Sequence, residues 1–231
     1  MSDVDAQAAS RPVVVCPLQF EREALVLAGL EVGCELFCCG PGAEAVTRWV
    51  ERDRPQESVR SPRPVILAGL AGALGDTCAV RSAAVIGAVV GADGRRWTPS
   101  LSGAAGGERA VITSVAASVT SPRARSDLAR ARHADLVDLE SEAFAAVATK
   151  AGWRWAIVRG ISDGPRTALP PGLDRWIDPA GRTRPARVFG GLARRPWFIP
   201  SLLRLRGDGA AAMLAVADMI RGMLEEVISD Q

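Results

Sequence analysis

The sequence has few of the residues on which metal centres and disulfide scaffolds depend. His133 is the only histidine in 231 residues, which excludes His-rich metal sites and argues against a Ser-His-Asp triad. The cysteines are odd in number and contain no C-x-x-C pair, a pattern that favours buried thiols in a reduced, cytosolic protein. We therefore expect no metal and no organic cofactor. The cysteines are Cys16, Cys34, Cys38, Cys39 and Cys78.

Long apolar runs and stretches of one charge sign are also missing. No apolar run approaches the roughly 18 residues of a membrane span, and the polar, acidic start of the chain does not resemble a secretory signal. The net charge is only +2, with acids and bases interspersed, so we expect no nucleic-acid partner. The length and a hydrophobic content of 48% suit one domain over 12–231, after a disordered tail over 1–11.

Short apolar runs that alternate with helical patterns predict an α/β fold. The near-continuous apolar strands indicate a sheet that is buried on both faces, and 83–114 is expected to be antiparallel, which makes the sheet mixed. Strands are predicted at 12–16, 35–39, 64–68, 79–90, 109–114, 135–138 and 153–161, helices at 19–29, 43–53, 121–132, 140–151 and 208–228, and loops at 54–63 and 99–107.

The stretch 135–163 holds two acidic clusters, one at the start of a predicted helix and one at the end of a predicted strand. Glu140 belongs to the first cluster and Asp163 to the second. A strand packed on the preceding helix can bring these two carboxylates into one cleft. Glu140 could then hold two ribose hydroxyls, because a carboxylate accepts several hydrogen bonds. Asp163 could protonate a purine base as it leaves a sugar.

Each of these residues also has a purely structural interpretation. Glu140 could only stabilise the start of a helix, and Asp163 could only form a turn with Gly164. Arg159 would lie in an apolar strand, where a charge is costly unless it is paired. It therefore predicts a salt bridge with a nearby acid, or an anion or nucleophile beside the ribose. Glu21, near the start of the first helix, could reach the site or could lie on a solvated face.

Two glycine-rich elements follow predicted strands. Glycines at 69 and 72, in GLAG, would let backbone N–H groups approach an anion or a sugar. The alternative is a tight turn after a buried strand. The same two interpretations apply to Gly40-Pro41-Gly42, where proline removes one donor. Both elements, together with Glu140 and Asp163, are expected at the C-terminal ends of strands, the edge where ligands bind in such sheets.

Four segments resemble, in order, the nucleoside phosphorylase family that includes methylthioadenosine/adenosylhomocysteine nucleosidase. VVVCPLQFEREAL resembles its first strand and acidic helix start, and PVILAGLAGAL its strand with glycines. VDLESEAFAAVA resembles its D-M-E segment, and AIVRGISDG its R-x-I-S-D segment. The resemblance covers about 12–164. The later stretch ALPPGLDRWIDPAGRTRPARVFGGLARRPWFIP resembles the hopanoid-associated phosphorylase branch.

The resemblance implies a three-layer, phosphorylase-like fold with a mixed, partly barrel-like central sheet. It implies an enzyme that cleaves the N-glycosidic bond of a purine ribonucleoside. The first expectation is phosphorolysis of an adenosyl-lipid such as adenosylhopane with inorganic phosphate as co-substrate, and the alternative is hydrolysis. A homo-oligomer is also implied. The implied catalytic residues are Asp163, Glu140 and Glu21, and the implied binding residues are Ser162, Leu139, Arg159, Gly40, Gly69, Leu70, Ala71 and Gly72.

The sequence also departs from the family pattern. Leu139 stands where methionine is usual, and Leu70 stands where many members have a small polar residue. Arg81-Ser82 replaces the usual Gly-Asp, and 114–119 lack an aspartate and an aromatic residue that many relatives place near the base. These departures leave a second expectation open, a nucleoside-binding domain without turnover.

A lipidic substrate would require an apolar entrance. PWFIPSLLRL, residues 196–205, could supply one and touch a membrane surface weakly. Core packing of a C-terminal helix is the preferred interpretation of this segment. An exposed apolar patch around Trp197 and Phe198 would instead favour the lipid hypothesis.

Overall fold

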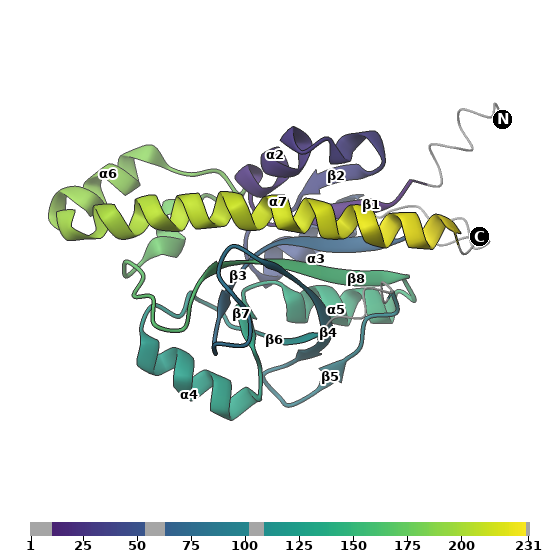
Figure 1. Ribbon diagram of the computed structural model, residues 1–231, viewed down its shortest axis with the longest axis horizontal. Coiled ribbons are helices and arrows are strands. Elements are labelled where there is room, and N and C mark those ends of the chain that lie inside the picture. Colours follow the sequence, from purple (N-terminus) through teal and green to yellow (C-terminus); the bar gives the residue numbers. More distant parts are fainter. Residues whose placement is uncertain (1–10, 54–62, 102–108, 230–231) are drawn as a thin grey trace.

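A computed structural model describes residues 11–53, 63–101 and 109–229 (Figure 1). The disordered tail and the two loops predicted from the sequence fall almost entirely outside these residues. The strands are β1 Val13–Cys16, β2 Glu35–Cys38, β3 Val65–Ala73, β4 Ala83–Val90, β5 Arg96–Trp97, β6 Ala110–Ser114, β7 Leu136–Asp138 and β8 Trp155–Asp163. The α-helices are α2 Gln19–Leu27, α3 Ala43–Asp53, α4 Pro122–Arg132, α5 Ser141–Lys150, α6 Pro185–Arg194 and α7 Ile199–Ser229. Short 3₁₀ turns are η1 Leu30–Val32, η2 Leu173–Trp176 and η3 Pro196–Phe198.

The sheet is mixed and part of it closes on itself. β3 pairs with β8, β8 with β4, β4 with β6, β6 with β7, and β7 returns to β3, so five strands form a barrel. β1 and β2 extend the sheet in parallel from β3, and β5 pairs antiparallel with β4. The predicted mixed, partly barrel-like α/β sheet is therefore confirmed.

Alternating side chains in the strands divide the core between two helical layers. Val13 and Val15 of β1 pack in the cluster that contains residues of α3 and α5, whereas Val14 packs in the cluster that contains residues of α2 and α7. This division follows from the strand period of two residues. Figure 1 shows α7 running along one side of the sheet. No helix among the residues described here is long and apolar enough to cross a membrane.

The prediction that 83–114 is antiparallel was only partly right. β4 and β5 form the expected hairpin, but β4 and β6 run parallel. About a dozen residues connect Trp97 to Ala110, which is long enough for a crossover that restores the direction of β4.

The interpretation of Gly69–Gly72 as a turn was wrong, because β3 continues through it to Ala73. The first half of β3 pairs with β1 and its last two residues pair with β7. The glycines therefore lie where the open sheet passes into the barrel, a place where strands often need residues without side chains.

The C-terminal helix begins nine residues earlier than expected, at Ile199 rather than 208. Pro200 is compatible with this start because the first turn of a helix needs no N–H donor there. Core packing was the wrong interpretation for the beginning of this segment, since Trp197, Ile199 and Leu203 are exposed. Core packing does hold further along α7, where Met213, Val216 and Ile220 are buried.

Candidate active site

The junction between β7 and α5 positions the first acidic cluster. Glu140 occupies the N-cap position of α5, but its side chain forms no capping hydrogen bond. Asp138 caps the helix instead, since its carboxylate accepts hydrogen bonds from the backbone N–H groups of Glu140 (3.3 Å) and Ser141 (3.1 Å). The Glu140 carboxylate is thereby left available for contacts with other elements.

Arg159, in the middle of β8, is fully buried and gathers three acids. Its Nη2 atom forms an ion pair with Asp138 and lies 3.5 Å from Glu140 Oε2. Glu140 Oε1 accepts a hydrogen bond from the Gly42 N–H at 2.7 Å. We call Arg159 and its three acids, Asp138, Glu140 and Glu21, the Arg159 centre.

Glu21 joins this centre from the first turn of α2. Its two carboxylate oxygens accept hydrogen bonds from the backbone N–H groups of Leu70 and Leu18, both at 2.8 Å. The side chain is 2% exposed, so the solvated-face interpretation was wrong. A Cβ atom at Gly69 would lie 2.6 Å from Arg159 Nη1 and 2.9 Å from Glu21 Oε1. Only glycine allows these two side chains to approach β3 so closely.

Burial controls the protonation of this centre. It raises the pKa of Glu21 to about 7, although the Arg159 charge opposes the change. It raises the pKa of Glu140 to about 8, and the neighbouring Asp138 charge acts in the same direction. Burial alone would lower the pKa of Arg159, but the surrounding carboxylates outweigh it and raise that pKa. The centre therefore combines a permanent cation with two carboxyl groups that titrate near neutral pH.

Asp163, the last residue of β8, lies in a second buried group that we call the Asp163 centre. Ser162 Oγ lies 2.5 Å from Asp163 Oδ1 and 3.3 Å from the carbonyl oxygen of Ala71. Arg125, a buried residue of α4, forms an ion pair with Asp163 Oδ2. A Cβ atom at Gly72 would lie 2.8 Å from Arg125 Nη1 and 3.1 Å from Asp163 Oδ2, so glycine again makes the room.

Arg125 is saturated with acceptors. Besides its ion pair, it donates to the carbonyl oxygens of Ala73 (3.2 Å), Gly164 (3.3 Å) and Val119 (3.2 Å). These bonds attach α4 to the ends of β3 and β8. They fix the guanidinium beside Asp163 whether or not a ligand is present.

Both centres contain buried atoms whose hydrogen-bonding capacity is unused within the described chain. Arg159 Nε and Nη1 have no acceptor, and Asp163 Oδ2 has no donor in hydrogen-bond geometry despite its ion pair. Buried polar atoms are almost always paired in folded proteins, so such exceptions commonly mark functional sites. Arg159 and Asp163 are four residues apart in β8, about 13 Å along the strand. The two centres therefore lie at different positions along the same strand.

The other predicted site residues are less directly involved. Leu70 contributes its backbone N–H to Glu21, while a Cβ atom at Gly209 of α7 would lie 3.0 Å from the Leu70 side chain. Leu139 is half-buried between Asp138 and Glu140. Gly40 packs against the backbone of Pro179, and it is Gly42, two residues later, that contacts Glu140.

Sequence reasoning missed Arg125 and Asp138 as members of the two centres. The helical spacing of α4 could have indicated that Arg125 faces the core. Leu128 and Ala129 lie three and four residues further along the helix, on the same face, and both pack against the core. An apolar residue stripe that includes one arginine predicts a buried, paired charge. Asp138 follows two buried apolar residues of β7, in the way that Asp163 follows the apolar part of β8.

The site is closed in this conformation. Asp163 and Glu140 are 6% and 5% exposed, and neither lines either of the two cavities found among the described residues. The loop at 115–121 lies over Arg125 and is tied to the loop at 165–174. Ser118 N–H donates to Asp174 Oδ2 at 3.0 Å, and Leu169 N–H donates to the Thr120 carbonyl oxygen at 3.1 Å. The two loops therefore cover the side of the Asp163 centre on which Arg125 lies.

Comparison with solved structures identifies related folds. Futalosine hydrolase of Helicobacter pylori has a TM-score of 0.61 and 14% identity, over 95% of this chain and 99% of that one. Methylthioadenosine/adenosylhomocysteine nucleosidase of Helicobacter pylori, in complex with an immucillin, has a TM-score of 0.61 and 15% identity, over 94% and 98%. A putative nucleosidase of this type from Borrelia burgdorferi, bound to adenine, has a TM-score of 0.62 and 12% identity, over 92% and 98%.

Sequence comparison adds nothing to these structural matches. No model of a known protein family matches the chain, and no curated protein matches it by sequence. The similarity to the nucleosidases nevertheless spans nearly the whole of each chain. The chain therefore has the fold of these nucleosidases.

Proposed function

We propose that the protein cleaves the N-glycosidic bond of a purine ribonucleoside. The observation that carries this proposal is a pair of buried groups on one strand: the Arg159 N–H donors, which have no acceptor among the described residues, and the Asp163 carboxyl, which Ser162 and Arg125 hold. The two residues are four positions apart in β8, about 13 Å along an ideal strand, which suits a base near Asp163 and a sugar with its nucleophile near Arg159. The fold shared with nucleosidases, one of them bound to adenine, supports the same assignment.

In the proposed reaction, the bond between the sugar C1′ and the base N9 breaks with its electron pair moving to the purine. A protonated Asp163 donates its proton to N7 of the leaving base. Arg125 stabilises the carboxylate that remains, because it is already held as an ion pair with Asp163 Oδ2. Glu140 accepts hydrogen bonds from the ribose hydroxyls and supports the positively charged sugar of the transition state.

Water is the nucleophile that the charges favour. Asp138 already balances the charge of Arg159, and Glu21 is partly ionised near neutral pH, so the centre has no net positive charge to attract a phosphate dianion. Glu21, with a pKa of about 7, suits a general base that takes a proton from water as its oxygen bonds to C1′. The products are then the free purine and the free sugar; Glu21 releases the proton it took from water to solvent, and solvent returns a proton to Asp163.

Phosphorolysis of an adenosyl-lipid, the reaction implied by the sequence resemblance, is the second candidate. The observation that favours it is the exposed apolar side chain of Trp197, together with those of Ile199 and Leu203, at the start of α7. An apolar group on the ribose 5′ position would find a surface there. For this reaction, inorganic phosphate would replace water at C1′ beside Arg159.

The test is release of free adenine from adenosine, methylthioadenosine and an adenosyl-lipid analogue, each with and without phosphate. Release without phosphate is expected, with the free sugar, carrying whatever group the substrate has at its 5′ position, as the second product. Phosphate-dependent release that yields a sugar 1-phosphate would instead establish the second candidate. No release from any of the three would contradict both reactions and favour a binding domain without turnover.

Two substitutions test the assigned roles. Asp163→Asn should lower the rate of base release by about 10²- to 10⁴-fold, because Asn cannot donate the proton. Glu140→Gln should weaken binding of ribonucleosides more than that of their deoxy analogues, because it loses acceptors for the ribose hydroxyls. Asp76→Asn and Glu142→Gln are the matched controls outside the two centres. Unchanged release by the Asp163→Asn variant would refute its role as the acid.

A further inference from the structure

Basic residues are concentrated in one acid-free segment, residues 179–207. The segment contains seven arginines and no Asp or Glu, whereas the rest of the chain has 21 basic and 26 acidic residues. The modest net charge of the whole chain conceals this separation. The arginines are Arg182, Arg184, Arg187, Arg194, Arg195, Arg204 and Arg206.

The same segment carries exposed apolar side chains. Phe189 is 71% exposed, Trp197 is 67% exposed and Leu203 is 65% exposed. None of the residues of α6 or η3 is buried. In Figure 1, α6 and the start of α7 lie together at one end of the molecule, away from both chain termini. Interspersed arginines and large apolar side chains on exposed helices are typical of helices that lie in a membrane interface.

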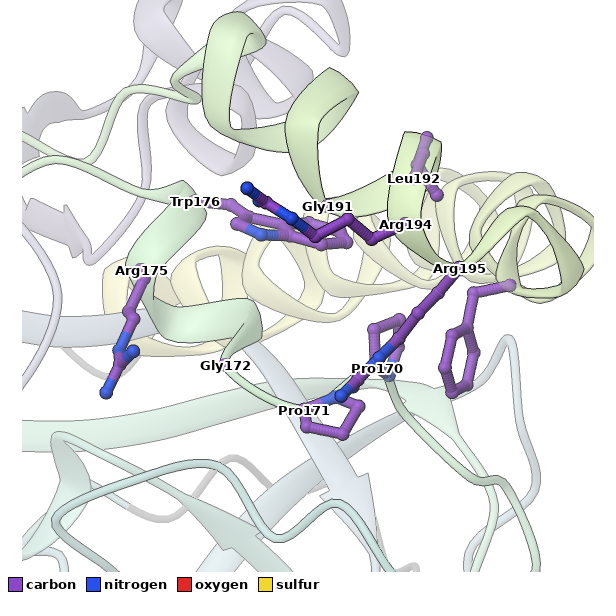
Figure 2. Close-up of a pocket in the computed structure, with 10 residues that line it drawn as sticks. Pro170, Pro171, Gly172, Arg175, Trp176, Gly191, Leu192, Arg194 and Arg195 are labelled. Atoms are coloured by element: carbon purple, nitrogen blue, oxygen red, sulfur yellow. The ribbon is translucent and has the colours of Figure 1, made fainter.

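A cavity of about 400 Å³ opens within this surface. Figure 2 shows Arg194 and Arg195 on the α6 side of the cavity and Arg175 on the η2 side. Trp176 and Phe198 complete much of the lining. Two guanidinium groups, those of Arg194 and Arg195, beside a cavity with aromatic walls suit an anionic head group attached to an apolar chain.

We propose that the surface formed by α6, η3 and the first turns of α7 docks onto membranes that contain anionic lipids. The apolar side chains of Phe189, Trp197 and Leu203 enter the interface between head groups and acyl chains. The arginines bind the lipid phosphates and raise the affinity for anionic over neutral membranes. This inference does not rest on the proposed reaction, because none of the residues that form the surface belongs to the Arg159 centre or the Asp163 centre.

The test is co-sedimentation of the full chain with vesicles of phosphatidylcholine alone, or of phosphatidylcholine and phosphatidylglycerol in equal parts. Binding to the mixed vesicles is expected, and it should weaken as salt is raised. The double variant Arg194→Gln/Arg195→Gln should bind about tenfold or more weakly, since each arginine near the surface contributes substantially. Trp197→Ser should also weaken binding, several-fold and on both compositions, because it removes an apolar anchor.

Matched controls carry the same changes elsewhere on the surface. Arg96→Gln/Arg123→Gln removes two exposed arginines outside the segment, and Leu27→Ser removes an apolar side chain that is 89% exposed on α2. Binding of these controls should equal that of the unchanged chain. Equal losses in the controls, or no preference for anionic vesicles, would overturn the proposal. The proposal would also fail if the Arg194→Gln/Arg195→Gln variant bound vesicles as the unchanged chain does and differed only in its oligomeric state or in its binding to single-stranded DNA, because the surface would then serve a different partner.

Discussion

The two buried arginines of the site differ in what surrounds them. Arg125 faces one carboxylate and three backbone carbonyl groups, and every one of its nitrogens has a partner. Arg159 faces three carboxyl groups, yet its Nε and Nη1 atoms have no acceptor among the described residues. Arg125 is thus already satisfied in the absence of a ligand, and Arg159 is not.

This difference separates a positioning role from a binding role. Arg125, whose nitrogens all have partners within the chain, holds Asp163 in place. An unsaturated arginine, beside two acids whose pKa values are near neutral, can bind and activate a small molecule. Both arginines reach β3 only because glycine stands opposite them, at Gly72 and Gly69. The comparison predicts different responses to substitution at the two centres.

The largest effect is expected from Arg159→Met. Removing this cation leaves three buried acids without their counter-charge, which should lower the free energy of unfolding by about 3–5 kcal/mol. Urea denaturation measures this loss, and Arg96→Met, at an exposed position, is the control. An equally stable Arg159→Met variant would show that the acids are held neutral without the arginine.

The second largest effect is expected in the pH dependence of the free energy of unfolding, because two acids of the Arg159 centre have raised pKa values. Glu21 keeps its proton up to a pH of about 7 in the folded chain, against an ordinary pKa of 4.5. Between these values the folded state binds more protons than the unfolded state, so the free energy of unfolding falls as pH rises. The contribution of Glu21 to this fall is about 3 kcal/mol. Glu140 extends the same decline to a pH of about 8.

Glu21→Gln should flatten this decline between pH 4.5 and 7, because the amide does not titrate. The slope is the readout, since Gln cannot accept hydrogen bonds from both Leu70 and Leu18 and so lowers stability at every pH. Glu23→Gln, an exposed change on the same helix, should leave the slope as it is. Glu140 alone should leave a shallower slope in the Glu21→Gln variant, and a slope equal to that of the unchanged chain would show that Glu21 does not contribute.

Most members of each centre were among the residues predicted from the sequence. Apolar strands that end in acids indicated Asp163, and an arginine within an apolar strand indicated Arg159, with a salt bridge to a nearby acid. Glu140, Glu21 and Ser162 were predicted as well, whereas Arg125 and the role of Asp138 were not. Their long-range partners were harder to find. Arg125 is one of four arginines in α4, and only its place beside Leu128 and Ala129 on the helix distinguishes it.

The direction of the strands depends on contacts that no local pattern contains. Runs of apolar residues predicted that β4 and β6 exist, but not that they would run parallel. The glycines of β3 were compatible with a turn in the sequence. In the structure they leave room for side chains from β8, α2 and α4. Glycine is compatible with both uses, because it lacks a Cβ atom in either setting. Only the neighbouring strands decide between them.

Alanine substitution of Gly69 or Gly72 should have a smaller effect on stability than the changes above, and it should affect turnover differently at the two centres. Gly69→Ala and Gly72→Ala each insert a Cβ atom closer than 3.0 Å to an arginine nitrogen, so each should cost about 1–3 kcal/mol of stability. Gly69→Ala should also impair substrate turnover by displacing Arg159 and Glu21. Gly75→Ala, which meets no atom within 4 Å, is the control. Equal stability of all three variants would mean that the arginines move aside without loss.

The smallest expected effect lies in the loops over Asp163. Ser118 and Asp174 tie these loops together through two hydrogen bonds at an exposed position. Asp174→Ala should lower the free energy of unfolding by only about 0.5–1.5 kcal/mol, the usual contribution of such bonds. It should increase the association rate of a purine ligand, because the loop at 115–121 covers one side of the Asp163 centre. Stopped-flow binding of a fluorescent purine analogue measures this rate, and Asp127→Ala on the outer face of α4 is the control. An unchanged association rate would show that ligands enter the site by another path, without opening these loops.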